Sequence, residues 1–304
     1  MPKLLFTQGT AILFSKTPGL ADIRESLEGI QIDKESSTSE TWQFGGPSLV
    51  VPFRPEANGT CSIDIVDRPW PDGMGDPKTD VTTFGAWIQG FFGPFTSPGA
   101  LERARSQCWN WPEAESLVAG HTAFVRVRHS YFSGLDKDQK IIPQDYQPLD
   151  ELRHAIMLAG KIMKVDGAIA LFNPNGECLS SLAEVEAALS RSDRTDLQEL
   201  WCNVRMFNDG RGNLIFDTKG LGQVDLRDHE VVIAGGKCDA DEIALFLRNI
   251  AAYVIANGQV IQDGDTVDGP GGKKWKCQYK EESTLPGPRE VIGWARVKKG
   301  LFAR

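Results

Sequence analysis

The chain has 304 residues, of which 41% are hydrophobic and 24% charged, as in an ordinary soluble protein, and this length suits two domains or one large one. Its formal net charge of -8 argues against nucleic acid or an anionic membrane as a main partner. No stretch approaches the ~18 apolar residues of a membrane span, and the N-terminus lacks a signal-peptide core. We therefore expect a cytoplasmic protein with no membrane partner.

The first half of the chain reads as short strands and helices. Residues 48–53 and 61–66 predict two strands, with Asn58-Gly59 as a hairpin signal between them. Residues 121–131 alternate with period two, which predicts a further strand. The remaining expectations in this half are a strand at 11–14, a helix at 21–28, an aromatic core segment at 84–95 and a helix after Pro98.

The second half begins with a helix predicted at residues 149–165, which we expect to join the two halves. A capping box of Ser181 and Glu184 starts another helix. Strands are predicted at residues 168–172, 200–207, 214–216, 230–234, 274–280 and 290–294.

The order of these elements predicts the fold class. Each half reads strand, helix, two or three strands, helix, strand, which is the split βαβ arrangement. We therefore predict an α+β protein of two ferredoxin-like halves with mainly antiparallel sheets. The predicted domains are residues 1–147 and 148–304. No internal sequence repeat is visible, so this duplication rests on element order alone.

The longest predicted helix covers residues 239–257. Asp239 stands in the capping position with Glu242 three residues later, and Gly258 is a good left-handed stop. Its apolar stripe consists of Ile243, Phe246, Leu247, Ile250, Ala251 and Val254, extended by Leu245 and Ile255. This width predicts a central helix that is buried on most of its circumference.

The spacing of cysteine, histidine and glycine residues along the sequence matches no metal or cofactor motif. The six cysteines form no C-x-x-C pair and lie at Cys61, Cys108, Cys178, Cys202, Cys238 and Cys277. The four histidines lack H-E-x-x-H spacing, Asp225 stands where a dinucleotide fingerprint needs glycine, and the Gly272-Lys273 pair lacks the remainder of a P-loop. We accordingly predict buried structural cysteines, no metal and no cofactor.

Histidines and a neighbouring carboxylate supply three candidate binding residues. His121 opens a predicted strand, and His229 and Glu230 are adjacent in another. Adjacent residues of a strand point to opposite faces, so His229 and Glu230 are not expected to share one site. Any of these groups that is buried must have a partner.

The segment 263–272 supplies two further candidates, Asp263 and Asp265. It is longer and richer in glycine than a return to the next strand requires. The carboxylates could therefore meet a ligand or a partner. The alternative is an ordinary connection whose turns are capped by aspartate.

Several short motifs of the C-terminal half occur in combination: Leu200-Trp201, Val204-Arg205, Phe207, Thr218-x-Gly220-Leu221, residues 228–231, Asn249-Ile250-Ala251-Ala252-Tyr253, Asn257-Gly258 and Asp263-Gly264-Asp265-Thr266. Trp111-Pro112-Glu113-Ala114 and the strand after it add to the pattern. With these residues, the chain resembles over most of residues 85–280 a bacterial family of uncharacterised proteins, domain of unknown function 4261. The resemblance implies a common fold and supplies no activity or catalytic residues.

Two functional hypotheses remain open. The first is a non-enzymatic protein-interaction module, for which toxin neutralisation (immunity) is one role, with a protein partner or a second copy of the chain. The alternative is a small-molecule enzyme or sensor with a pocket between the two halves. Its acid and base groups would come from His121, Glu230, Asp263 and Asp265. The absence of a clustered nucleophile, base or metal motif favours the first hypothesis.

Overall fold

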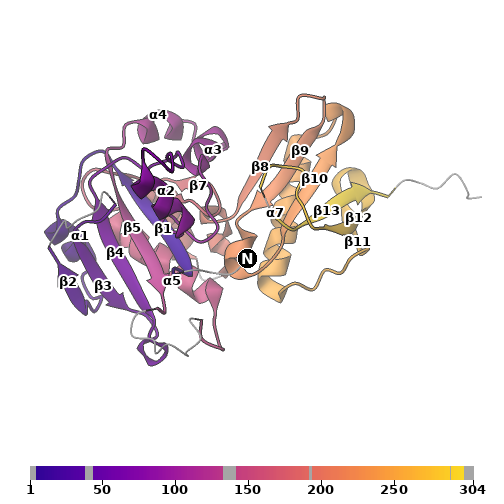
Figure 1. Cartoon of the computed structure of the whole chain (residues 1–304). Helices are drawn as coiled ribbons and strands as arrows, with labels where there is room; N and C mark the ends of the chain where they lie inside the picture. The colour runs from indigo at the N-terminus through magenta and orange to yellow at the C-terminus, as the bar shows by residue number, and fades with distance from the viewer. Residues whose placement is uncertain (1–4, 38–43, 133–141, 192–193, 288, 298–304) are drawn as a thin grey trace, which may run out of the picture. The chain divides into compact units, whose positions relative to one another are not determined.

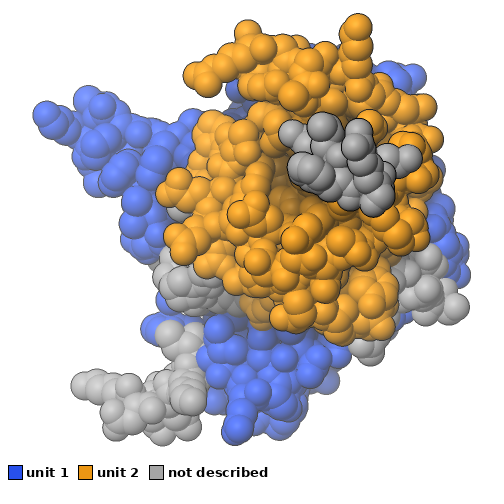
Figure 2. Space-filling view, turned by 90° about the vertical axis from the view of Figure 1, so that its right-hand side faces the viewer, with its two compact units in different colours: residues 1–201 blue, residues 202–304 orange. Residues whose placement is uncertain are grey.

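The computed structural model describes residues 5–37, 44–132, 142–191, 194–287 and 289–297. It divides the chain into two units, Met1–Trp201 and Cys202–Arg304 (Figure 2). Each unit contains its own sheet (Figure 1). The α+β class and the largely antiparallel sheets predicted from the sequence are thus confirmed. No helix among the described residues is both long and apolar enough to cross a bilayer.

The first unit is organised around a seven-stranded sheet of order β2-β3-β4-β5-β1-β6-β7. Its strands are β1 (Gln8–Phe14), β2 (Lys34–Ser36), β3 (Ser48–Pro52), β4 (Thr60–Val66), β5 (Ala123–Ser130), β6 (Ala168–Asn173) and β7 (Cys178–Ser180). All neighbouring pairs in this sheet are antiparallel. The central strand β1 lies between β5 and β6, so segments distant in sequence meet in the middle of the unit.

Helices lie on both faces of this sheet (Figure 1). They are α1 (Leu20–Ser26), α2 (Val81–Ile88), α3 (Ala100–Ser106), α4 (Ala114–Ala119), α5 (Pro148–Ile162) and α6 (Leu182–Ser190). On one face, α2, α3 and α4 enclose an aromatic core in which Trp70, Trp87 and Phe92 pack against the sheet. Trp87 and Phe92 come from the aromatic segment 84–95, which was expected to form core. On the other face, α5 packs against β1 and β5.

The position of α5 changes the expected division of the chain. It lies on the first sheet instead of joining two halves, and β6 after it pairs with β1 through Ala11↔Phe172 and Ile12↔Leu171. Residues 168–180 therefore complete the first sheet. The units meet at Trp201 and Cys202, well beyond the expected boundary at residues 147 and 148.

The second unit contains a six-stranded sheet of order β11-β12-β13-β10-β9-β8. Its strands are β8 (Asn203–Asn208), β9 (Leu214–Lys219), β10 (Asp228–Ile233), β11 (Thr266–Gly269), β12 (Lys273–Lys280) and β13 (Val291–Arg296). β10 and β13 run parallel, and the other pairs are antiparallel. Between Cys202 and the end of the described residues there is one α-helix, α7 (Ala240–Asn257). A split βαβ unit needs two helices, so the ferredoxin-like arrangement is not confirmed.

The boundaries of α7 follow the capping signals of the sequence. The Asp239 side chain accepts a hydrogen bond from the backbone N–H of Glu242, and Gly258 ends the helix with φ of 78°. The six residues of the predicted apolar stripe are all buried. Leu245 and Tyr253 are more than half exposed, so the prediction of burial around most of the circumference is wrong. Short 3-10 turns complete the chain at Pro55–Ala57, Arg194–Leu200, Leu221–Val224, Ala234–Gly236 and Pro270–Gly272.

Candidate metal centre

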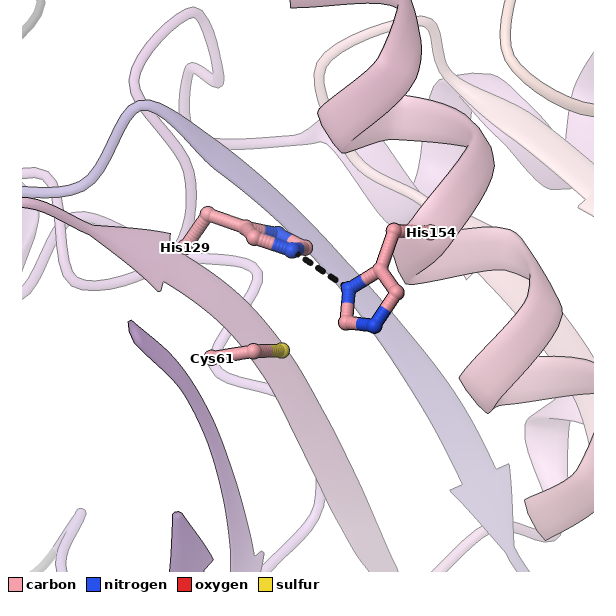
Figure 3. Close-up of side chains that lie close together, drawn as sticks. All are labelled: Cys61, His129 and His154. Carbon is pink, nitrogen blue, oxygen red and sulfur yellow. Dashed lines mark hydrogen bonds between the residues drawn. The ribbon is translucent and has the colours of Figure 1, made fainter. Parts of the chain in front are cut away.

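A row of side chains crosses the first sheet beneath α5. Cys61 in β4 lies directly opposite His129 in β5, and His129 lies opposite Gln8 in β1. Directly opposed residues of antiparallel strands project from the same face of a sheet. The thiol, the imidazole and the amide are therefore neighbours on one face, and His154 of α5 reaches the same place (Figure 3).

Three possible metal ligands converge at this point. The donor atoms of Cys61, His129 and His154 all lie within 4.8 Å of one another. Nε2 of His129 and Nδ1 of His154 are hydrogen-bonded at 2.8 Å. Cys61 and His129 have no exposed surface, whereas His154 is half-buried. We call these three residues the Cys–His cluster.

The ring of Phe53 packs against both imidazoles of the cluster. Its centroid lies 4.7 Å from that of His129 and 4.8 Å from that of His154. Phe53 begins the connection from β3 to β4, in which Arg54 and Asn58 adopt left-handed backbone angles. A Cβ at Gly59 would collide with the carbonyl oxygen of Phe53, so the turn requires glycine there.

The environment of the cluster keeps all three groups neutral. Burial, together with the neighbouring His154, lowers the pKa of His129 far below its ordinary value, and burial lowers the pKa of His154 to about 4. Burial and the negative charge of Glu151 raise the pKa of the Cys61 thiol. A reactive cysteine needs a lowered pKa and access to solvent, so Cys61 lacks the character of a nucleophile. Neutral imidazoles, by contrast, are the form that binds metals.

Glu151, whose charge acts on Cys61, connects the cluster to two tyrosines. The Tyr146 hydroxyl donates a 2.9 Å hydrogen bond to the buried carboxylate of Glu151. Burial and Glu151 raise the pKa of the buried Tyr131. Among the described residues, Nδ1 of His129 has no hydrogen-bond partner. An orphaned ring nitrogen at this depth is uncommon in folded proteins.

His121, the first of the residues chosen from the sequence, has a structural position. Its Nε2 accepts a hydrogen bond from the backbone N–H of Trp70 at 2.8 Å, and its Nδ1 lies 2.6 Å from the carbonyl oxygen of Val118. With Nδ1 protonated, both nitrogens are satisfied. The imidazole therefore links the end of α4 to the segment that begins the aromatic core. Its role in binding stays a prediction.

Glu230 is the most densely hydrogen-bonded carboxylate among the sequence candidates. It is fully buried and accepts from Lys280 Nζ at 2.9 Å, Ser283 Oγ at 2.8 Å, and the N–H and hydroxyl of Thr284 at 2.8 and 2.6 Å. Burial alone would raise the pKa of Glu230, but these donors lower it below its ordinary value. The carboxylate holds residues 283–284 against β10.

His229, next to Glu230, has a separate environment. Its Nδ1 accepts a hydrogen bond from Nε1 of Trp294 at 3.1 Å, and burial lowers its pKa to about 3. The partners of His229 and Glu230 differ entirely, as expected for adjacent residues of a strand. The structure does not bring the pair into one site.

A charged network continues across the same sheet from Glu230. Asp217, opposite Glu230 in β9, accepts two hydrogen bonds from Arg205 at 3.0 and 2.6 Å and another from Arg289. Arg289 also pairs with Asp228. We call Arg205, Asp217, Asp228, Glu230, Lys280 and Arg289 the charged network. Its opposite charges balance, and every carboxylate in it has several donors.

A glycine permits one long contact in this network. Gly293 of β13 lies between Glu230 and Gln278 in the row across the sheet. A Cβ at position 293 would collide with the side chain of Lys280. The missing side chain thus lets Lys280 cross β13 and reach Glu230.

Asp263 and Asp265 cap the turn that precedes β11. Asp263 Oδ1 accepts from the backbone N–H of Tyr279 at 2.7 Å, and Asp265 Oδ2 accepts from that of Gln262 at 2.8 Å. These bonds fit the capped-turn alternative. Asp263 also lines an open hollow of about 560 Å³, together with Lys276, Lys280 and Trp294. A ligand or partner at this turn stays a prediction.

None of the five sequence candidates belongs to the Cys–His cluster, and sequence reasoning missed all three of its members. Cys61 and His129 are distant along the chain and meet only through strand register. The available signal was the period-two pattern of residues 121–131, which places His129 on the same face as Val125 and Val127. That pattern marks a buried histidine without identifying its neighbours.

The comparisons with known proteins concern the second unit. The family model described as Domain of unknown function (DUF4261) matches residues 217–295, from β9 to β13. This range contains most of the charged network and all of α7, and it supports the resemblance seen in the sequence from residue 217 onward, whereas residues 85–216 lie outside the match. No curated protein and no solved structure is detectably similar to the chain. The Cys–His cluster lies outside the matched range.

Proposed function

We propose that this chain, whose residues 217–295 form a DUF4261 domain, is a non-enzymatic binding protein that takes up a transition-metal ion in its first unit. One observation carries the proposal: a thiol and two neutral imidazoles from β4, β5 and α5 converge within 4.8 Å. Thiolate and imidazole are the ligands that zinc and copper ions prefer in proteins. The prediction of no metal rested on spacing along the sequence, which does not reveal ligands that meet only in the fold.

Metal binding suits this cluster better than nucleophilic catalysis. A buried thiol with a raised pKa reacts slowly with electrophiles, and neither imidazole is charged to stabilise a thiolate. A metal ion overcomes the raised pKa because it binds the thiolate directly and releases the proton. The bound ion would also tie α5 to the sheet and so stabilise the folded first unit.

Elemental analysis of the full chain tests this proposal. The protein is stripped with a chelator, equilibrated anaerobically with Zn²⁺ or with Cu⁺, and separated from free ion. We expect one equivalent of at least one ion to be retained and to be lost in Cys61→Ser. The matched control is Cys108→Ser, which changes a half-buried cysteine of the same unit outside the cluster. Retention of neither ion, or equal retention by Cys61→Ser, overturns the proposal.

For the second unit we retain the protein-interaction module as the proposed role. What supports it over an enzyme is that Glu230 accepts four hydrogen bonds inside the unit, which leaves it poorly suited to exchange protons with a substrate. Immunity-type neutralisation is one role of this class. Sedimentation equilibrium over a wide concentration range tests the simplest partner, a second copy of the chain. A monomeric mass throughout would exclude that partner.

A small-molecule enzyme or sensor is the competing proposal for the second unit. The hollow lined by Asp263, Lys276 and Lys280 supports it, because groups of both charges face the same space. Removal of the Asp263 charge separates the two proposals. Loss of a measurable small-molecule affinity in a folded Asp263→Asn variant would favour the sensor.

A further inference from the structure

The number and type of donors in the Cys–His cluster restrict the ion it can hold. The group consists of one thiol and two imidazoles, and no fourth Cys, His, Asp or Glu joins it among the described residues. Structural zinc sites almost always use four protein ligands. Trigonal sites of one cysteine and two histidines are instead typical of copper.

The surroundings of the cluster disfavour water as a missing fourth ligand. Cys61 and His129 have no exposed surface, and the Phe53 ring packs against both imidazoles. A zinc ion with three protein ligands normally completes its shell with water or substrate. Copper(I) needs no fourth ligand, so an apolar ring over the imidazoles does not conflict with its coordination.

Charge favours the same ion. Binding follows the balance Cys–SH + Cu⁺ → Cys–S–Cu + H⁺, so the copper(I) complex with two neutral imidazoles has no net charge. The same ligands around Zn²⁺ leave a net charge of +1. A buried net charge is costly unless it is paired. Glu151 is a buried anion whose charge acts on Cys61, and its contribution can be measured separately.

We infer that the ion bound by the Cys–His cluster is copper(I), held in three-coordinate geometry by Sγ of Cys61, Nε2 of His129 and Nδ1 of His154. This inference rests on the proposed metal-binding function. The ion replaces the 2.8 Å hydrogen bond between the two imidazoles, and each ring keeps its proton on the other nitrogen. For His129 that nitrogen is the buried Nδ1.

X-ray absorption spectroscopy of the full chain loaded with copper(I) ion tests the geometry. We expect a first shell of one sulfur and two nitrogen atoms and a coordination number of three. The parallel measurement uses the chain loaded with zinc ion. Four-coordinate zinc on the cluster, with copper(I) bound elsewhere or not at all, overturns the inference and leaves the metal-binding function standing. Binding of neither ion overturns both.

Competition titrations against chromophoric chelators test each ligand. His154→Gln should weaken copper(I) binding at least about 100-fold, because removal of even an outer-shell partner costs 10–100-fold. His154 is half-buried on α5, so this variant should fold. The matched control is His121→Gln, outside the cluster, which should leave copper(I) affinity unchanged. Equal affinities of the two variants would contradict the assignment.

Glu151→Gln distinguishes the two charge states of the complex. A neutral copper(I) complex gains little from a nearby anion, so its affinity should be unchanged by this variant. A zinc complex of charge +1 should lose at least about tenfold when the anion is removed. A comparable loss for copper(I) would show that the bound complex carries positive charge and would refute the neutral three-coordinate site.

Discussion

The two units each bury a polar cluster, and the clusters differ in how their groups are satisfied. In the second unit, Asp217 and Glu230 are fully buried and each accepts hydrogen bonds from several donors of the same unit. In the first unit, Cys61 and His129 are equally buried, yet Nδ1 of His129 has no partner among the described residues. The two clusters are therefore equally buried but differ in how many of their polar atoms have hydrogen-bond partners.

This difference separates structure from binding capacity. In a fully hydrogen-bonded network of charges, the donors and acceptors are already used within the fold. Removal of one partner leaves a buried charge unpaired. The neutral thiol and imidazoles of the Cys–His cluster retain donor atoms that an external metal ion can bind. The charged network should therefore contribute more to stability than the metal-free Cys–His cluster, whereas the Cys–His cluster should determine metal binding.

Asp217→Asn should produce the largest loss of stability. The change leaves Arg205 and Arg289 without their shared buried anion, and breaking such a pair costs about 3–5 kcal/mol. Chemical denaturation of the full chain, with hydrogen exchange in β9 and β10, measures the effect. Asp268→Asn is the control, because its ion pair with Lys274 is exposed and contributes about 0–1 kcal/mol. Similar losses in both variants would show that the charged network is not structural.

The stability loss expected for Asp217→Asn can be compared with the loss caused by truncating a buried apolar side chain of the same unit. Leu247 of α7 is completely buried, and its truncation in Leu247→Ala should cost about 2–5 kcal/mol. Leu245→Ala removes the same atoms from an exposed position and should cost about 0.5 kcal/mol or less. Thermal and denaturant unfolding compare the two. A loss below about 1 kcal/mol for Leu247→Ala would make α7 peripheral to the second unit.

Helices and strands whose signals lie close together in the sequence were predictable from it. The Ser181–Glu184 capping box is formed by both side chains, and Asp239 and Gly258 bound α7 as expected. The period-two pattern of residues 121–131 corresponds to β5. Each signal describes a choice made within one or two turns of chain, where local backbone geometry dominates.

Elements that depend on distant pairing were not predictable in the same way. Ile12 lies opposite both Val125 and Leu171, so β1 joins segments that have no common motif. The parallel pairing of β10 with β13 is equally nonlocal. These pairings decide which unit a strand belongs to, and element order alone therefore placed the division of the chain elsewhere.

The candidate sites show the same limit at the level of side chains. Glu230 could be selected as a carboxylate in an apolar strand, but its partners Ser283 and Thr284 follow from the path of a loop. Cys61 and His129 become neighbours only through register. A site assembled from separate strands and a helix has no fixed spacing in the sequence, so motif searches do not find it.

Acid should destabilise the metal-free first unit through its buried histidines. The pKa of His154 falls from its ordinary 6.5 to about 4 in the folded chain, so the unfolded chain binds the proton first. Stability is thus fully present above pH 6.5 and declines as the pH falls toward about 4. His154→Gln removes this term, worth about 1–2 kcal/mol after allowance for the exposed part of the ring.

Unfolding free energies measured across this pH range check the expectation. The slope of stability against pH should be smaller in His154→Gln than in the original chain. His121→Gln is the comparison variant, because burial also lowers the pKa of His121, which lies outside the cluster. An unchanged slope in His154→Gln would mean that His154 titrates normally and is not enclosed by the cluster.

The smallest expected effects concern Asp263. Its substitution tests whether the polar groups of the turn before β11 stabilise the fold or bind a ligand. Asp263→Ala removes the acceptor for the backbone N–H of Tyr279 and should cost about 1 kcal/mol. Asp263→Asn keeps an oxygen at the same position and should cost less, since the hydrogen bond survives without the charge. Asp265→Asn, which keeps the acceptor for Gln262, should behave alike. Denaturant unfolding of the variants, singly and combined, measures these differences. If Asp263→Asn and Asp265→Asn leave stability unchanged but lower the affinity for a ligand or partner, the two charges contribute to binding. If both lower stability by over about 1 kcal/mol while the affinity is unchanged, the turn has a structural role like that of the charged network.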